Sequence, residues 1–237
     1  FMLSDIYRTR NLRAEAYLWC MPIPTSVYAE MTPNPAVMKF VADRPLIEGD
    51  YQAEFRSKTE ASWCSPLAEE LFNFPFVKGV FISGCFVSVS KDESLGWEMI
   101  VQQLREYVRE WLMENEQAVD TAAFLNVQEK LETAQEPEID PGVAEANASV
   151  NFIPENEMVP SEHDAEIKRL LDEFVRPAVE QDGGAIDFKA FKEGKVYVHM
   201  RGACSGCPSS MQTLKGGIEQ LLTSKLDAVE EVVALGV

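Results

Sequence analysis

The chain has 237 residues, of which 46% are hydrophobic and 25% are charged, and its formal net charge is −18. This length suits one large domain or two small ones, and the composition is typical of a soluble globular protein. The negative charge argues against nucleic-acid binding by bulk electrostatics, and no apolar run approaches the roughly 18 residues of a membrane span. We therefore expect neither nucleic acid nor a membrane as a partner.

Residues 1–24 are predicted to be an extension outside the folded domains. They lack a continuous apolar region and a small-residue cleavage site, which argues against a secretory signal. Asp5 and Glu15 argue against a mitochondrial presequence. The five cysteines form no regular framework beyond one pair, a pattern that suits a reducing compartment. These features favour the bacterial cytoplasm, with the mitochondrial matrix as the alternative.

Residues 25–113 are predicted to form a first compact α+β domain. Runs of apolar residues with a period of two indicate strands, and apolar residues at helical spacing indicate helices. The expected elements are strands at 26–30 and 36–41, a helix opened by Ser65-Pro66, a hairpin of 77–83 with 86–90, and a long helix from Trp97 to Met113.

Residues 114–162 are predicted to be an acidic linker that is helical over 119–131. Residues 114–163 contain 12 acidic residues and one basic residue, and so a net charge of −11. The second half places four prolines among acidic and small residues, which is the composition of a solvated spacer.

Residues 163–237 are predicted to form a second small domain with the order α-β-β-α-β. The expected elements are a helix capped by Ser161 or Asp164 with Ile167, Leu170, Leu171, Phe174 and Val175 as its apolar face, a turn at 182–184, a hairpin of 185–191 with 195–201, a helix opened by Pro208, and a strand at 229–235. The fold class is thus α+β, with two small α/β domains joined by an acidic linker.

A Cys-x-x-Cys pair, Cys204 and Cys207, lies between the predicted hairpin and the last helix. A helix N-terminus stabilises anions, and the flanking Gly202 and Gly206 let the backbone turn tightly. We therefore expect both cysteines to be thiolates near neutral pH. The spacing allows two sulfurs to bind one metal centre or to close a redox disulfide.

Three functions are compatible with this pair. A thiol–disulfide oxidoreductase would use Cys204 to attack and Cys207 to resolve, but here a hairpin precedes the pair where a thioredoxin fold has a βαβ unit. Structural zinc needs four ligands, and His199 is the remaining candidate in this domain. An iron–sulfur cluster also needs four thiolates, which two chains would supply across a two-fold axis.

Longer motifs around the pair resemble a known family. The segments 174–185 and 202–211, with the Leu214 helix, resemble the C-terminal domain of NifU. In the first domain, Thr32-Pro-Asn-Pro35 with Met38–Phe40, Ser65–Ala68 and Val77–Phe81, resembles the N-terminal domain of Nfu proteins. The resemblance covers most of the chain outside the extension and the linker.

This resemblance implies an iron–sulfur cluster carrier that is not an enzyme. Cys204 and Cys207 match the family's cluster ligands, so a [4Fe-4S] cluster, with [2Fe-2S] as the alternative, would be shared by a homodimer. The expected partners are apo iron–sulfur proteins as clients and an upstream cluster assembly scaffold. Cys64 and Cys85 are interpreted as single structural cysteines, with Cys85 exposed on a hairpin turn.

Overall fold

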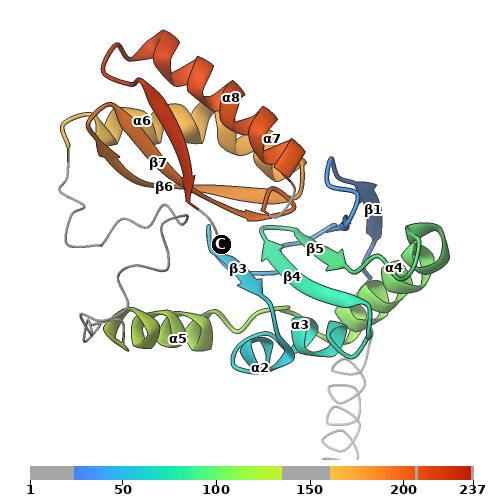
Figure 1. The fold of residues 1–237 in the computed structure, drawn as a ribbon. Coiled ribbons are helices and arrows are strands. Elements are labelled where there is room, and N and C mark those ends of the chain that lie inside the picture. The colour runs from blue at the N-terminus through green and yellow to red at the C-terminus, as the bar shows by residue number, and fades with distance from the viewer. Residues whose placement is uncertain (1–23, 135–160, 206–207, 236–237) are drawn as a thin grey trace, which may run out of the picture.

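The computed structural model describes residues 24–134, 161–205 and 208–235, and these form two α+β domains (Figure 1). The predicted α+β class is confirmed. The predicted extension at 1–24 lies almost wholly outside the described residues, as does the second half of the acidic linker. None of the helices in the described ranges is long and apolar enough to cross a membrane.

The N-terminal domain is built on a five-stranded antiparallel sheet. Its strands lie in the order β1-β2-β5-β4-β3. They are β1 (Val27–Met31), β2 (Val37–Ala42), β3 (Gln52–Phe55), β4 (Val77–Ser83) and β5 (Phe86–Lys91). The two predicted strands and the predicted hairpin are confirmed, and β3 is an addition of four residues.

Helices cover one face of this sheet. They are α2 (Lys58–Ala61), α3 (Pro66–Leu71), α4 (Trp97–Glu114) and α5 (Thr121–Ala134). Alternate strand residues such as Phe40, Val87 and Ile82 point toward them and are fully buried. The α3 helix begins as predicted, because the Ser65 hydroxyl accepts from the Ala68 backbone N–H at 3.2 Å.

The N-terminal core extends past residue 113. Ala118, Val119 and Phe124 belong to the same buried cluster as the sheet and α4. The beginning of the predicted acidic linker therefore packs on the first domain, and its predicted helix is present as α5. The division of the chain at 113 and 162 stays a prediction.

The C-terminal domain has the predicted α-β-β-α-β order. Its elements are α6 (Asp164–Leu170), the π-helical turn η2 (Leu171–Val175), α7 (Arg176–Gln181), β6 (Gly184–Lys192), β7 (Lys195–Gly202), α8 (Pro208–Lys225) and β8 (Glu231–Leu235). Strand β7 is central, antiparallel to β6 and parallel to β8. The parallel pair requires a crossover, and α8 supplies it.

Two local predictions in this domain need correction. Phe174 was expected on the buried helix face, yet it is 47% exposed. The wider π-helical turn changes the residue spacing, so a regular 3.6-residue period no longer places Phe174 inward. The first helix has His163 at its N-cap, and the Ser161 hydroxyl accepts from the His163 backbone N–H instead of capping the helix itself.

Candidate metal centre

The candidate centre lies on the turn that joins β7 to α8. Strand β7 ends at Gly202, whose φ of +66° is a left-handed conformation that favours glycine. Ser205 closes the turn, because its backbone N–H and its hydroxyl both donate to the Gly202 carbonyl, at 3.1 and 2.8 Å. Cys204 therefore stands at the carboxyl end of the central strand, on a turn fixed by its own backbone. We call residues 202–205 the cysteine turn.

Cys204 is seated against the beginning of β6. A Cβ atom added to Gly184 would lie 2.6 Å from the Cys204 Sγ and 2.7 Å from the Arg201 carbonyl oxygen. Glycine at 184 thus leaves the space that the thiol occupies. The Ala203 N–H also donates to the Gly183 carbonyl at 3.2 Å. The turn predicted at 182–184 is confirmed as a backbone turn, and it also forms the seat of Cys204.

The predicted thiolate at Cys204 is wrong for this conformation. Cys204 is only 6% exposed and belongs to the C-terminal core. Burial, and secondarily the Asp182 carboxylate, raise the pKa of Cys204 to about 12. The local sequence predicted stabilisation by a helix N-terminus, but desolvation and a neighbouring negative charge outweigh it. Cys204 must become more exposed before it can act as a thiolate ligand.

Cys207 lies outside the described residues, so its predicted place beside Cys204 stays a prediction. Of the other cysteines, Cys64 is buried and Cys85 is exposed, as expected, and Cys20 falls outside the described residues. Burial, followed by the Asp120 carboxylate, raises the pKa of Cys64 to about 11. Cys64 therefore fits the interpretation as a structural core cysteine, whereas Cys85 lies at the surface.

His199, the extra candidate for a zinc site, lies on β7 three positions before the cysteine turn. Burial, followed by the nearby Arg201 guanidinium, lowers the pKa of His199. Within the described residues, no three His, Cys, Asp or Glu side chains gather as a metal site would require. The described part of one chain therefore does not complete a zinc site around Cys204.

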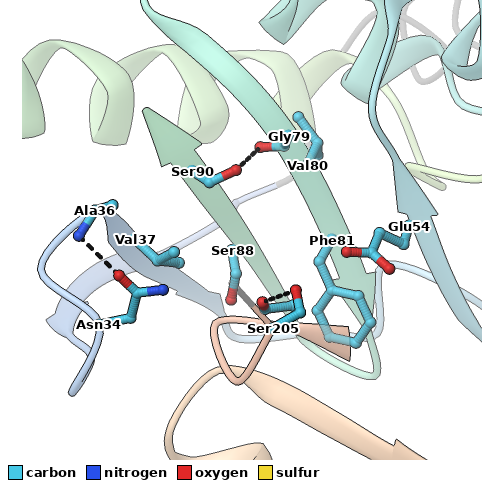
Figure 2. Close-up of a pocket in the computed structure, with 11 residues that line it drawn as sticks. Asn34, Ala36, Val37, Glu54, Gly79, Val80, Phe81, Ser88, Ser90 and Ser205 are labelled. Carbon is cyan, nitrogen blue, oxygen red and sulfur yellow. Dashed lines mark hydrogen bonds between the residues drawn. The ribbon is translucent and has the colours of Figure 1, made fainter. Parts of the chain in front are cut away.

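The N-terminal domain contacts the cysteine turn, which the sequence patterns do not predict. Asn34 Nδ2 donates to the Ala203 carbonyl at 3.2 Å in a buried position. Figure 2 shows Asn34, Ser88 and Phe81 around the loop that carries Ser205. The motif Thr32-Pro-Asn-Pro35 is the one sequence feature that points to this contact. The motif alone does not indicate what the Asn34 side chain binds.

The comparisons with known proteins cover both domains. The model for the NifU-like domain matches residues 167–233, and the model for the scaffold protein Nfu/NifU N terminal matches residues 27–115. Relatives from several organisms carry the name NFU1 iron-sulfur cluster scaffold homolog, mitochondrial. The relative from Homo sapiens is 31% identical over 89% of this chain and 76% of its own length. The relative from Drosophila persimilis is 31% identical over 87% of this chain, which spans 64% of that relative's length. With both domain models matched in order and the human relative covered over three quarters of its length, the chain belongs to the Nfu family of NifU-like proteins.

Proposed function

We propose that this chain is an iron–sulfur cluster carrier. Its cargo is a [4Fe-4S] cluster, with [2Fe-2S] as the alternative, held between two protomers by Cys204 and Cys207 of each chain and passed to apo-proteins. The observation that carries the proposal is the position of Cys204 on a glycine-built turn between strand and helix, within the matched NifU-like domain. The relatives' names, which describe iron–sulfur cluster scaffolds, support the same function.

The donor set fits a cluster that two chains share. A cluster of this kind is usually held by four thiolates, and one Cys-x-x-Cys pair supplies two of them. The described residues of one chain contain no group of three His, Cys, Asp or Glu side chains that could hold a metal. A two-fold axis through the cluster would double the pair to four. A cluster at such an interface can leave by exchange with the thiolates of an acceptor protein, so the chain needs no catalytic acid or base.

In this proposal the N-terminal domain and the acidic linker assist cluster transfer. The N-terminal domain recognises clients or the upstream assembly scaffold. The acidic linker keeps that domain tethered, which raises the effective concentration of cluster near a docked client. The relatives' names favour a mitochondrial location over the bacterial cytoplasm.

The test is anaerobic reconstitution of the full chain with iron and sulfide. We expect an absorption band near about 400 nm, about two Fe and two S per chain, and one [4Fe-4S] cluster for each pair of chains. Sedimentation should show a dimer with cluster and a smaller species after chelation, because the cluster bridges the protomers.

Matched cysteine variants separate the proposal from its rivals. Cys204→Ala and Cys207→Ala should lose the band, whereas Cys64→Ala and Cys85→Ala should keep it. A colourless protein with zinc at about half an equivalent per chain would indicate a structural zinc dimer instead. A metal-free protein with a reversible disulfide would indicate the thiol–disulfide oxidoreductase.

A further inference from the structure

One row of side chains crosses the N-terminal sheet on the face that the helices leave open. The strand register pairs Lys39 with Ser88, Ser88 with Phe81, and Phe81 with Glu54. Residues directly opposite one another on neighbouring strands share a face of the sheet. These four residues therefore form one row over β2, β5, β4 and β3, and we call it the docking row.

Two members of the docking row bind backbone carbonyls that precede the cysteine seat. Ser88 Oγ donates to the Gly183 carbonyl at 2.8 Å, and Lys39 Nζ donates to the Gln181 carbonyl at 3.1 Å. Both donors are side chains of the first domain, and both acceptors belong to the backbone of the second. The contact therefore recognises the shape of the 181–183 turn rather than its side chains.

The other two members contact the cysteine turn itself. A Cβ atom on Gly202 would lie 2.8 Å from Phe81 Cδ1, so the ring lies directly against that residue. Glu54 and Gly202 line the same cavity. Burial raises the pKa of Glu54, and the Arg56 guanidinium and then the Gly202 backbone N–H oppose this rise. Asn34 adds its bond to the Ala203 carbonyl, and the Arg201 guanidinium donates to the Gln52 carbonyl at 3.4 Å. The N-terminal domain thus touches both residues that immediately precede Cys204.

We propose that the docking row and Asn34 form a releasable cover for the cysteine turn. In the resting chain the N-terminal domain docks on the turn, and Pro33 lines the same small pocket as Cys204, so the docked domain restricts access to the thiol. It undocks when two chains bring their turns together around a cluster. The role of undocking rests on the proposed function, because a cluster shared by two chains requires their cysteine turns to meet. The docking itself is a property of the metal-free chain.

The contact has the properties of an interface that can open. Its buried apolar part is small and consists of Phe81, Phe86 and Ala185. A cavity of about 240 Å³ remains between the sheet face and the cysteine turn, with Ser88 and Ser205 among its lining residues (Figure 2). Interfaces between domains of one chain that are small and polar permit relative motion, whereas a permanent interface is packed like a core.

Ser88 and Ser90 provide a matched pair of variants. Both lie on β5, face the same side of the sheet and line the same cavity, but Ser90 Oγ donates to Gly79 within the N-terminal domain at 3.2 Å. Ser88→Ala removes a bond between the domains, and Ser90→Ala removes one inside a domain. Loss of one such bond should increase the undocked fraction about 2- to 12-fold. Lys39→Met, which keeps the aliphatic stem, should multiply this effect when combined with Ser88→Ala.

The experiment measures iodoacetamide alkylation of each cysteine in the metal-free full chain by peptide mass spectrometry, together with the radius of gyration from small-angle X-ray scattering. We expect Ser88→Ala to raise the alkylation rate of Cys204 about 2- to 12-fold and to increase the radius, and Ser90→Ala to change neither. Buried Cys64 reports global unfolding and should stay slow in every variant.

Three outcomes would overturn the cover. The first is the same Cys204 rate in Ser88→Ala, Ser90→Ala and the unmodified chain. The second is a larger radius without faster alkylation, which would show that docking does not protect the thiol. The third is equal acceleration at Cys64, which would show unfolding instead. Because no cluster is present, these outcomes are independent of whether reconstitution succeeds.

Discussion

The two domains each bury a cysteine, but the surroundings of the two thiols differ. Cys64 lies in the N-terminal core beside residues of the α2–α3 region, and Cys204 lies in the C-terminal core at the end of β7. Burial raises the pKa of both thiols. Burial and pKa therefore do not distinguish a structural cysteine from a candidate ligand. What distinguishes Cys204 is a turn between strand and helix that another domain can cover or uncover.

The comparison of the two cysteines assumes that the N-terminal and C-terminal cores unfold separately. The variant Phe40→Ala has the largest expected effect and tests this assumption. Phe40 is fully buried under the helices of the N-terminal domain, so its truncation should cost about 3–5 kcal/mol of that domain's stability. Hydrogen exchange during denaturation should show lost protection in β2, β4 and β5 and retained protection in β6 and β7. Equal loss in both domains would show a single cooperative core.

Leu222→Ala is the reciprocal change in the C-terminal domain. Leu222 is fully buried on α8, and its truncation should cost about 2–5 kcal/mol. Because α8 follows the cysteine turn, this variant should also speed alkylation of Cys204 while Cys64 stays protected. Unchanged reactivity of Cys204 in a destabilised C-terminal domain would separate the turn from the core beneath it.

Gly184→Ala sharpens the comparison at the seat of Cys204. The added methyl group would overlap the Cys204 sulfur and the Arg201 carbonyl, so we expect a loss of about 1–3 kcal/mol by thermal or chemical denaturation. Gly216→Ala is the control, because nothing lies within 4 Å of its added Cβ. That control should stabilise α8 by up to about 1 kcal/mol. Similar changes in stability in the two variants would contradict the steric role proposed for Gly184.

The smallest expected effect is a pH dependence in the C-terminal domain. Burial lowers the pKa of His199 from its ordinary value of 6.5, so the unfolded chain binds a proton there more readily than the folded chain. The free energy of unfolding should therefore be retained above pH 6.5 and fall as the pH drops below it. Between pH 7 and pH 5 the free energy of unfolding of His199→Gln, measured by chemical denaturation, should fall less than that of the unmodified chain. An equal fall in both proteins would show that other groups cause the pH dependence.

The sequence predicted the elements whose patterns extend over several turns or strand repeats. The apolar spacing from Trp97 onward predicted α4, and the alternation on either side of Gly84 predicted the β4–β5 hairpin. Strand β3 and helix α2 have four residues each, too few for a period to be recognised. The position of β3 at the sheet edge also depends on its pairing with β4, which its own residues do not specify.

The sequence predicted which residue is the candidate ligand but not the buried surroundings in which it lies. The Cys-x-x-Cys spacing and the resemblance identified Cys204 from neighbouring residues. The thiol is seated against Gly184, which lies 20 positions earlier, and the turn that carries it is contacted by Asn34, which lies 170 positions earlier. Local pattern carries no information about such distant partners, so the expected thiolate was derived from the helix N-terminus alone.

The separation of Asn34 and Ala203 also sets an order of events during synthesis. Their hydrogen bond joins residues 169 positions apart, and the Ser88–Gly183 bond joins residues 95 apart. Neither bond can form until the last quarter of the chain has been translated, when every strand of the N-terminal sheet is already available. Closing loops of this length carries an entropic cost that the small contact must overcome. The cysteine turn of a newly made chain therefore emerges when the domain that contacts it is already available.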